Sequence, residues 1–332
     1  MEKQKEDVVT IKSSNKKNTN KSVKSNKKIE TKNIANKDNK VVVITGVTSG
    51  MGNEVTKRLM EKGGYTIIGT CRILLSKSIN EMASWNEKYT KSDLHLAIGD
   101  LTEMAQVRNL FYNIKIKLQK LGFDRIDILY LNAGQMLQKI DMSSENNELQ
   151  WASNYLANVL LIELLLPLLR NSKDARIILT TCDKALKTKL NWDIINNPKK
   201  YSATALYNQS KLAELMFALE FDYRHLDEKN IRTFVVNPGR VRTNLGLRYT
   251  TGFQRFLCNL RNLRACSVEE GIASVMYLIE APNLPSRVVY YKNMCPKMPS
   301  NYALDLCNRE ELYKSSFRIL NLPLESPQDL EE

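Results

Sequence analysis

The stretch that decides the fold is "VVVITGVTSGMG", Val41 to Gly52, in which an apolar, β-branched run leads directly into a glycine-rich turn. A helical pattern, "NEVTKRLMEKG", follows at once. Glycines at such a turn let the backbone bend sharply and approach a pyrophosphate at the helix N-terminus, where free N–H groups and the helix dipole favour an anion. Because strand, turn and helix arrive in this order, the stretch predicts a dinucleotide-binding loop. The residues assigned to this loop are Thr45, Gly46, Thr48, Ser49, Gly50, Met51 and Gly52.

Short apolar runs alternate with longer amphipathic ones along the rest of the chain. Strands are expected at 41–46, 65–72, 94–101, 126–134, 175–182, 232–239 and 287–292. Apolar strands that alternate with helices indicate a parallel sheet covered on both faces, so we expect a single Rossmann-type, doubly wound α/β fold. No internal repeat or Pro/Gly-rich linker divides the pattern, which favours one domain over 41–325 with a flexible tail at 326–332.

The positive charge of the chain is concentrated at its start. Residues 1–40 contain 12 lysines and 5 acidic residues and therefore carry +7 of the formal net charge of +13. A segment so rich in Lys, Asn and Ser buries too little apolar surface to offset the entropy of ordering it, which predicts a disordered N-terminal arm. A solvated tail is favoured over a nucleic-acid-binding one, so no nucleic-acid partner is expected.

The composition disfavours several classes of site and location. A chain of 332 residues that is 43% hydrophobic and 26% charged is ordinary for a soluble protein with a sizeable core. Six cysteines without CxxC pairing and only two histidines leave little material for a disulfide framework, a metal site or a Ser-His-Asp triad, so no metal is expected. The arm lacks the apolar core of a secretory signal, which favours a cytoplasmic location.

Small or polar residues follow three of the expected strands. The second strand is followed by "TCR", which places Arg72 where an acidic residue would bind the ribose 2′-hydroxyl of NAD. An arginine there accommodates a 2′-phosphate, so NADP(H) is preferred over NAD(H). The third strand ends in "GDL", where an adenine would lie, and the fourth in "NAG", whose small residues permit close approach to a cofactor. The residues assigned to the cofactor here are Asp100, Leu101, Asn132, Ala133 and Gly134.

The stretch "ALYNQSK", Ala205 to Lys211, sets a tyrosine four residues before a lysine in a helical pattern. Residues at i and i+4 share one face of a helix, so the Lys211 ammonium is expected near the Tyr207 phenol, where it favours the ionised form. Such a pair would deliver a proton at neutral pH. Tyrosine and lysine are also common on amphipathic helices, so the pattern by itself leaves a structural role open.

Taken in order, "TGVTSGMG", "GDL", "NAG", "YNQSK" and "NPGRVRT" resemble the short-chain dehydrogenase/reductase family from Val41 to about Leu324. The resemblance implies that Tyr207 is the general acid/base and that Lys211 holds the nicotinamide ribose and lowers the tyrosine pKa. Asn154, in the helical pattern at 149–171, matches the asparagine that supports a proton-relay water. The segment "NPGRVRT" is similar to the one that shapes the nicotinamide pocket, and Thr243 matches a contact to the carboxamide. The cofactor residues assigned to this segment are Pro238, Gly239, Val241 and Thr243.

One position departs from the family pattern. Family members usually end the fifth strand in Ser-Ser, and the second serine helps to hold the substrate oxygen, whereas "LTTC" places Cys182 there. A thiol is a weaker, longer-reaching donor than a hydroxyl. Because strand residues alternate between faces, Thr181 is expected to point away from the cofactor and Thr180 to lie on the same side as Cys182. Cys182 joins the catalytic set, and an inactive family member stands as an alternative.

Other segments indicate the branch of the family. The insertion between Cys182 and Tyr207, with "CR" after the second strand, resembles the retinol dehydrogenase-like branch, which acts on lipophilic alcohols and ketones. "ILYLNAG" and "LLIELLLPLL" are also similar to 3-ketosteroid reductases. The segment 240–266 is rich in Phe, Leu and Arg and is expected to form a lid over the substrate, with peripheral contact to an anionic membrane such as the endoplasmic reticulum as an open possibility.

The helical patterns at 155–169 and 207–221 have more apolar surface than one sheet layer needs to cover. Family members commonly pair through the corresponding helices, so a homodimer or homotetramer is expected.

Two functions from different classes fit these residues. The first is an NADP(H)-dependent oxidoreductase that interconverts a lipophilic carbonyl, retinoid-like or steroid-like, and its alcohol, with a 3-ketosteroid reductase as the alternative within the family. The second is a dinucleotide-binding sensor or scaffold without turnover. Both predict cofactor binding, and only the first predicts consumption of NADPH in the presence of a carbonyl.

Overall fold

The computed structural model describes residues 36–72, 77–243, 245, 265–285 and 289–324. Most of the expected arm 1–40, most of the expected lid 240–266 and the whole tail 326–332 lie outside these residues, so those predictions stand untested. The chain divides into a unit Met1–Asn33 and a unit Ile34–Glu332, and the second contains every described element. The described fold begins before the expected boundary, since Asn39 is buried and its Nδ2 donates to Thr66 Oγ1 at 3.3 Å.

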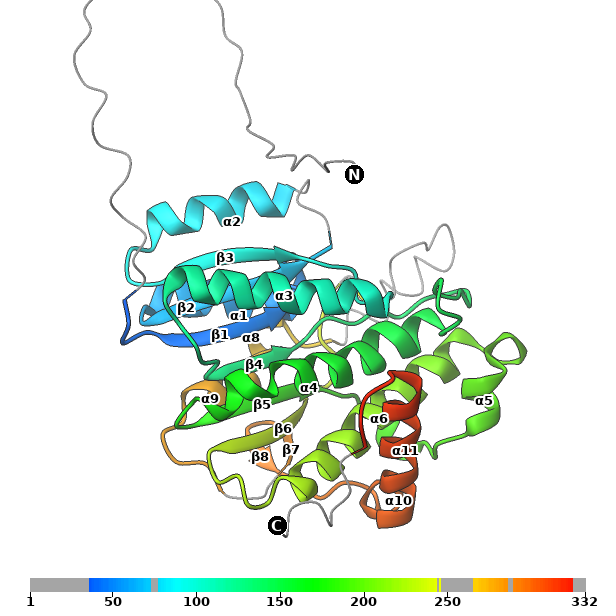
Figure 1. Ribbon diagram of the computed structural model, residues 1–332. Helices are drawn as coiled ribbons and strands as arrows, with labels where there is room; N and C mark the ends of the chain where they lie inside the picture. The colour runs from blue at the N-terminus through cyan, green and yellow to red at the C-terminus, as the bar shows by residue number, and fades with distance from the viewer. Residues whose placement is uncertain (1–35, 73–76, 244, 246–264, 286–288, 325–332) are drawn as a thin grey trace, which may run out of the picture. The chain divides into compact units, whose positions relative to one another are not determined.

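An eight-stranded sheet with the order β3-β2-β1-β4-β5-β6-β7-β8 runs through this unit (Figure 1). The strands are β1 (Lys40–Thr45), β2 (Tyr65–Cys71), β3 (Asp93–Ile98), β4 (Ile128–Leu131), β5 (Ala175–Thr180), β6 (Ile231–Asn237), β7 (Tyr290–Lys292) and β8 (Cys295–Pro296). The first seven are parallel, and β8, which the sequence did not predict, is antiparallel to β7. The strand order reverses at β1, between β2 and β4, which is the point where such sheets bind ligands. The predicted doubly wound fold is confirmed.

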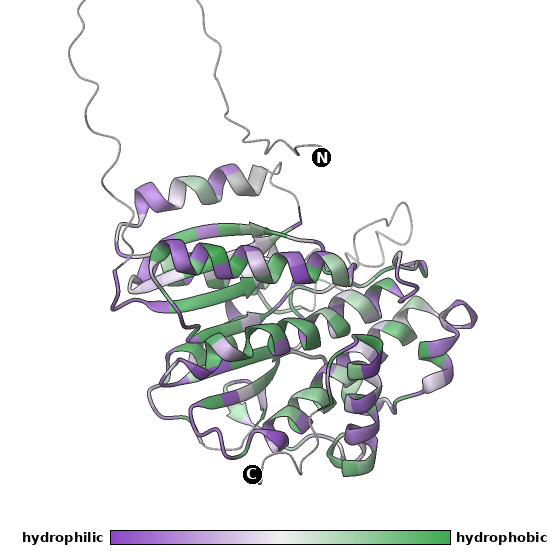
Figure 2. Cartoon of the chain, viewed as in Figure 1, coloured by the Kyte–Doolittle hydropathy of each residue, from purple (hydrophilic) through white to green (hydrophobic). Residues whose placement is uncertain are grey.

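Alternate residues of each strand face two separate hydrophobic cores. In β1, Val41 and Val43 belong to one core, and Val42 and Ile44 belong to the other. The first core is covered by α3 (Met104–Leu121), the π-helical turn η1 (Trp151–Leu156), α4 (Ala157–Arg170) and α6 (Ala203–Arg224). The second is covered by α1 (Gly50–Lys62), α2 (Lys77–Lys88) and α9 (Ala273–Glu280). Figure 2 shows the resulting hydrophobic strands between helices whose outer faces are hydrophilic. Because both faces are covered, the strands read as continuous apolar runs.

Short elements connect this framework and complete it at the C-terminal end. They are η2 (Ala185–Lys187), α5 (Trp192–Asn196), η3 (Pro198–Lys200), α8 (Val268–Gly271), α10 (Asn301–Leu304) and α11 (Leu306–Ile319). In α11, Tyr313 stacks on Phe217 of α6 with ring centroids 5.8 Å apart, and Ser316 Oγ lies 2.6 Å from the hydroxyl of Tyr155. The C-terminal helix therefore covers part of the apolar surface on which the expectation of a dimer rested. Assembly stays a prediction.

Among the described residues, one helix is long and apolar enough to cross a membrane by length and composition, the continuous segment Trp151–Arg170. Of its most apolar window, 78% is buried inside the fold. Packing against the sheet, α6 and α11 therefore accounts for its apolar character.

Candidate active site

The turn between β1 and α1 has backbone conformations and contacts that glycine alone fits. Gly50 has φ +61°, in the left-handed region that side chains disfavour. A Cβ on Gly52 would lie 2.4 Å from Asn132 Nδ2 and 2.5 Å from the carbonyl oxygen of Gly46. The first turn of α1 contains no acidic residue. The N-cap residue Ser49 makes no side-chain hydrogen bond to the start of α1, so the N–H groups there would favour an anion.

The ends of β1 and β4 are joined by side-chain hydrogen bonds. Thr45 Oγ1 accepts from the backbone N–H groups of Asn132 at 3.0 Å and Ala133 at 2.9 Å. Asn132 Nδ2 donates in turn to the Thr45 carbonyl at 3.0 Å. A Cβ on Gly134, the next residue but one, would lie 3.3 Å from Asn154 Oδ1. The "NAG" segment thus brings the glycine-rich turn beside the helices that carry the expected catalytic residues.

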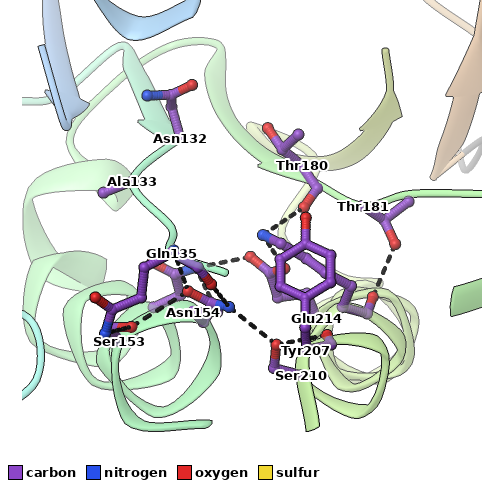
Figure 3. Close-up of polar contacts among 12 residues, drawn as sticks. Asn132, Ala133, Gln135, Ser153, Asn154, Thr180, Thr181, Tyr207, Ser210 and Glu214 are labelled. Atoms are coloured by element: carbon purple, nitrogen blue, oxygen red, sulfur yellow. Dashed lines mark hydrogen bonds and ion pairs between the residues drawn. The ribbon is translucent and has the colours of Figure 1, made fainter. Parts of the chain in front are cut away.

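Tyr207, labelled in Figure 3, and Lys211 lie on α6, one turn apart. The Lys211 ammonium donates to the Thr180 carbonyl at 3.0 Å and forms an ion pair with Glu214 Oε2 at 2.7 Å. An ammonium has three N–H donors, so these two partners leave one for a ligand. Both charged side chains are almost completely buried, with exposed fractions of 5% for Lys211 and 0% for Glu214.

The charge around Tyr207 differs from what the sequence implied. Burial raises the pKa of Tyr207 well above its ordinary value, and Cys182 and the Glu214 carboxylate raise it further. The resemblance implied that Lys211 lowers this pKa. Since Glu214 sits one turn beyond Lys211 and pairs with it, the lysine charge that was expected to favour the phenolate is balanced.

Asn154, in η1, has both side-chain groups committed to neighbouring protein atoms. Its Oδ1 accepts from the Gln135 backbone N–H at 2.8 Å, and its Nδ2 donates to the Gln135 carbonyl at 3.0 Å and to Ser210 Oγ at 3.1 Å. Ser210 Oγ donates to the Tyr207 carbonyl at 2.8 Å. Asn154 therefore fixes the loop after β4 against the helix that carries Tyr207 (Figure 3).

At the end of β5, the side chains of Thr180 and Thr181 have different surroundings. Thr181 Oγ1 donates to the Lys211 carbonyl at 2.8 Å, so this side chain points into α6. Thr180 lines the cavity described below, whereas Cys182 does not. Cys182 is partly buried beside Tyr207, and burial raises the pKa of its thiol. The place expected for a substrate-binding serine thus carries a thiol that lies beside Tyr207 and outside the lining of the cavity.

The residues assigned to the adenosine part of a cofactor lie at the ends of β2 and β3. Arg72 is exposed, and within the described part of the chain it forms no ion pair. Asp100 Oδ1 accepts from the N–H and the hydroxyl of Thr102, at 3.0 and 2.9 Å. Leu101 is buried beside them. Arg72 is therefore available to an anion from solvent.

The segment after β6 returns to the glycine-rich turn. The Gly239 N–H donates to Asn237 Oδ1 at 3.0 Å, and Val241 forms a bridge with Cys266. Thr243 Cγ2 would lie 3.5 Å from a Cβ on Gly50. Pro238, Gly239 and Val241 do not line the cavity, whereas Thr243 does.

One cavity at the carboxyl ends of the strands brings most of the predicted residues together. The predicted residues that line it are Gly46, Thr48, Ser49, Gly50, Met51, Arg72, Asp100, Leu101, Asn132, Ala133, Gly134, Tyr207, Lys211 and Thr243. Those that lie outside its lining are Thr45, Gly52, Asn154, Cys182, Pro238, Gly239 and Val241. Thr45 and Asn154 hold lining residues in place through the hydrogen bonds given above, and Gly52 leaves room for Asn132 and the Gly46 carbonyl.

Sequence reasoning missed several residues of the site. Those that line the cavity are Thr70, Cys71, Gly99, Thr102, Gln135, Met136, Leu137 and Ser153, while Thr180 and Leu245, which also line it, were expected on the side of Cys182 and within the lid but were given no role of their own. Most are sequence neighbours of predicted residues, so wider windows around the strand ends would have included them. Glu214 was also missed. Its only signal in the sequence is an acidic residue at i+3 from Lys211 within the apolar run "LAELMFAL".

Comparisons with known proteins agree with this geometry. A family model described as short chain dehydrogenase matches residues 40–251. Human retinol dehydrogenase 14 (Homo sapiens) is 30% identical over 216 residues, which cover 62% of this chain and 63% of that protein, less than two thirds of its length. Mouse retinol dehydrogenase 12 (Mus musculus) is 27% identical over 290 residues, which cover 86% of this chain and 88% of that protein. The structure of NADPH-bound carbonyl reductase from chicken fatty liver has a TM-score of 0.58 at 19% identity, covers 79% of this chain and 99% of that one, and shows similarity of fold.

Proposed function

The chain belongs to the short-chain dehydrogenase family, and from this premise we propose that it is an NADP(H)-dependent oxidoreductase that interconverts a lipophilic carbonyl and its alcohol. The observation that carries the proposal is the convergence of Tyr207 and Lys211 with the glycine-rich turn on one cavity. A tyrosine that keeps its proton is suited to give it to a carbonyl oxygen. The start of α1, which would favour the pyrophosphate, and Tyr207, which would act as the acid, line the same cavity.

The nicotinamide ring of the bound cofactor would supply or accept the hydride. The start of α1 would hold the pyrophosphate, and the third N–H of Lys211 would bind a ribose hydroxyl. In the reduction direction the Tyr207 hydroxyl would donate its proton to the substrate oxygen, and in the oxidation direction the phenolate would take a proton from the alcohol. Thr180 and Ser153 line the same cavity and would orient the substrate or the cofactor beside the tyrosine.

Arg72 supports the preference for NADP(H). It lines the cavity at the end of β2 and is free of acidic partners within the described residues, so its guanidinium would pair with a 2′-phosphate. The chicken carbonyl reductase structure named above contains NADPH.

A lipophilic, retinoid-like or steroid-like substrate is supported by the apolar residues in the lining of the cavity. Met136, Leu137 and Leu245 line it, and the expected lid at 240–266 would extend this surface. The names of the relatives, retinol dehydrogenases 14 and 12, favour a retinoid-like substrate, with a 3-ketosteroid as the alternative. We also propose a cytoplasmic protein, a homodimer or homotetramer, with peripheral membrane contact through the lid.

A screen of turnover tests the proposal. NADPH consumption would be followed with retinal, steroid ketones and simple aldehydes, and Tyr207→Phe is expected to abolish it while NADPH still binds. Binding of NADPH without consumption by any carbonyl would reject the enzyme and favour the sensor or scaffold. The observation that keeps this second function in view is Cys182, which replaces a serine and lies outside the cavity lining. Cys182→Ser is expected to raise turnover with little change in NADPH affinity.

A further inference from the structure

Glu214 is the one charged residue of the site that no motif indicated. Its side chain is fully buried, one turn beyond Lys211 on α6. One carboxylate oxygen pairs with the Lys211 ammonium at 2.7 Å, and the other accepts from Asn158 Nδ2 at 2.8 Å. Asn158 Nδ2 also donates to the Asn154 carbonyl at 2.7 Å. A chain of direct contacts therefore runs from the catalytic helix to η1, with Glu214 as its only anion among the described residues.

A buried carboxylate beside a buried ammonium changes what the ammonium does to its other neighbours. A lone positive charge within about 4–6 Å of a phenol favours the phenolate and lowers its pKa by about 1–3 units, and a negative charge has the opposite effect. When Glu214 is ionised, the Lys211–Glu214 pair is neutral as a whole. Burial raises the pKa of Glu214 to about 7, although Lys211 and Asn158 lower it, so the carboxylate is ionised in the alkaline range where a tyrosine titrates.

The titratable groups around Tyr207 come from three elements. Lys211 and Glu214 lie on α6, Cys182 follows β5, and Tyr155 of η1 faces Glu214. Burial raises the pKa values of the Cys182 thiol and the Tyr155 phenol, so both are neutral where Tyr207 acts as an acid. At alkaline pH an ionised Cys182 raises the pKa of Tyr207 together with Glu214, whereas at neutral pH, where the thiol is protonated, Glu214 and its partner Lys211 remain.

We propose that Glu214 is a positioning residue for the reaction proposed above: it holds Lys211, balances its charge, and so keeps the proton on Tyr207. A protonated tyrosine is the form that carbonyl reduction requires, and a phenolate is the form that alcohol oxidation requires. Glu214 thus keeps reduction active to higher pH and delays the onset of oxidation to higher pH. This inference rests on the proposed function, since it assigns a role within the same site.

The pH dependence of Glu214→Gln tests the inference. Reduction of retinal by NADPH and oxidation of retinol by NADP would be measured as kcat/KM against pH. Removing the negative charge leaves the Lys211 charge unbalanced, so both midpoints are expected to move to lower pH by about one unit or more. Glu214→Asp retains the charge and is expected to keep the midpoints of the unaltered protein. Midpoints that stay in place or move upward in Glu214→Gln would overturn the proposal.

Glu220→Gln is the matched control. Glu220 is also buried on α6, but it pairs with Arg224 at 2.8 Å and lies 3.7 Å from Arg309, away from the cavity. Its substitution is expected to lower stability and to leave both pH midpoints unchanged. A shift of the same size in this variant would show that general loosening of α6, rather than the charge of Glu214, moves the profile.

A measurement without turnover separates this inference from the proposed function. The difference in phenolate absorbance between a protein and its Tyr207→Phe variant reports the ionisation of Tyr207 alone. This difference is expected at lower pH in the Glu214→Gln background, even if no carbonyl is reduced. If Glu214→Gln does not fold, the double variant Lys211→Met/Glu214→Gln removes both charges, and Tyr207 is expected to titrate as in the unaltered protein. If Tyr207 titrates at higher pH in the double variant than in the unaltered protein, Glu214 does not balance the charge of Lys211, and the proposal fails.

Discussion

Replacing Gly52 by alanine tests whether the glycine-rich turn is built for close contact. The added Cβ would lie 2.4 Å from Asn132 Nδ2 and 2.5 Å from the Gly46 carbonyl oxygen, so one of the two must move. Overpacking of this kind costs about 1–3 kcal/mol. Moving Asn132 also weakens its 3.0 Å hydrogen bond to the Thr45 carbonyl, a loss of about 1 kcal/mol. We expect the free energy of unfolding to fall by about 2–4 kcal/mol, measured by urea denaturation.

The same substitution is expected to weaken cofactor binding, because Gly46 and Asn132 line the cavity that it would distort. Gly64→Ala is the control. Gly64 has φ +85°, but a Cβ there would meet nothing within 4 Å, so the cost is backbone strain alone, about 1–2 kcal/mol. NADPH titration should show a loss of about tenfold or more for Gly52→Ala and no change for Gly64→Ala. Unchanged NADPH affinity in Gly52→Ala would refute the argument that this contact shapes the binding turn.

Three further changes test other parts of the fold and site. Arg72→Asp should narrow or reverse the preference for NADPH over NADH, measured by titration with both, because it removes a phosphate partner and adds a repelling charge. Burial alone would raise the pKa of Asp174, but Arg176 and Arg232 hold it below its ordinary value. The stability that this pairing contributes is present above the ordinary carboxyl pKa and is lost as the pH falls through the lowered pKa of Asp174. Asp174→Asn should therefore lower stability by about 1–2 kcal/mol at pH 7, a figure reduced for the partial exposure of the pair, and by little near pH 2. Thermal melts at the two pH values measure the difference. Tyr313→Ala should lower stability by about 3–5 kcal/mol and, by exposing α6, increase association in light scattering.

The central strands β1, β2, β4, β5 and β6 could be predicted from the sequence because they are buried on both faces and therefore read as apolar runs. Their ends could not. The expected strands continued past Leu131 and Thr180. Beyond these residues the next side chains bind neighbouring elements, Asn132 to β1 and Thr181 to α6. A local pattern records that a residue is polar, and it does not record which distant backbone group the side chain will bind. The short strand β8 was also missed. It follows a turn with positive φ at Asn293 and Met294, and neither residue is a glycine, the residue from which such a turn would be predicted.

The candidate site divides in the same way. Residues whose role depends on their own chemistry or on lack of a side chain, such as Tyr207, Lys211 and Gly50, could be proposed from motifs and their order along the chain. Residues whose role depends on a partner could not, and Glu214 is the clearest example. An acidic residue in an apolar helical run looks unfavourable until the buried ammonium one turn away and the Asn158 amide are known.

The cavity has polar residues that are held by hydrogen bonds and apolar residues that are not, and this difference affects substrate selectivity. Around Tyr207, the polar side chains Asn154, Ser210 and Lys211 each bind a defined protein atom, and a buried polar group that loses its partner costs about 1–3 kcal/mol. Because of that cost, these polar side chains keep one arrangement and have little freedom to adapt to different substrates. The apolar residues Met136 and Leu245 carry no such cost, because an apolar wall can be reshaped at the expense of packing alone. Substitutions that change which carbonyl is reduced are therefore expected at the apolar residues and in the expected lid. Substitutions of the polar residues around Tyr207 are expected to change the rate for every substrate alike.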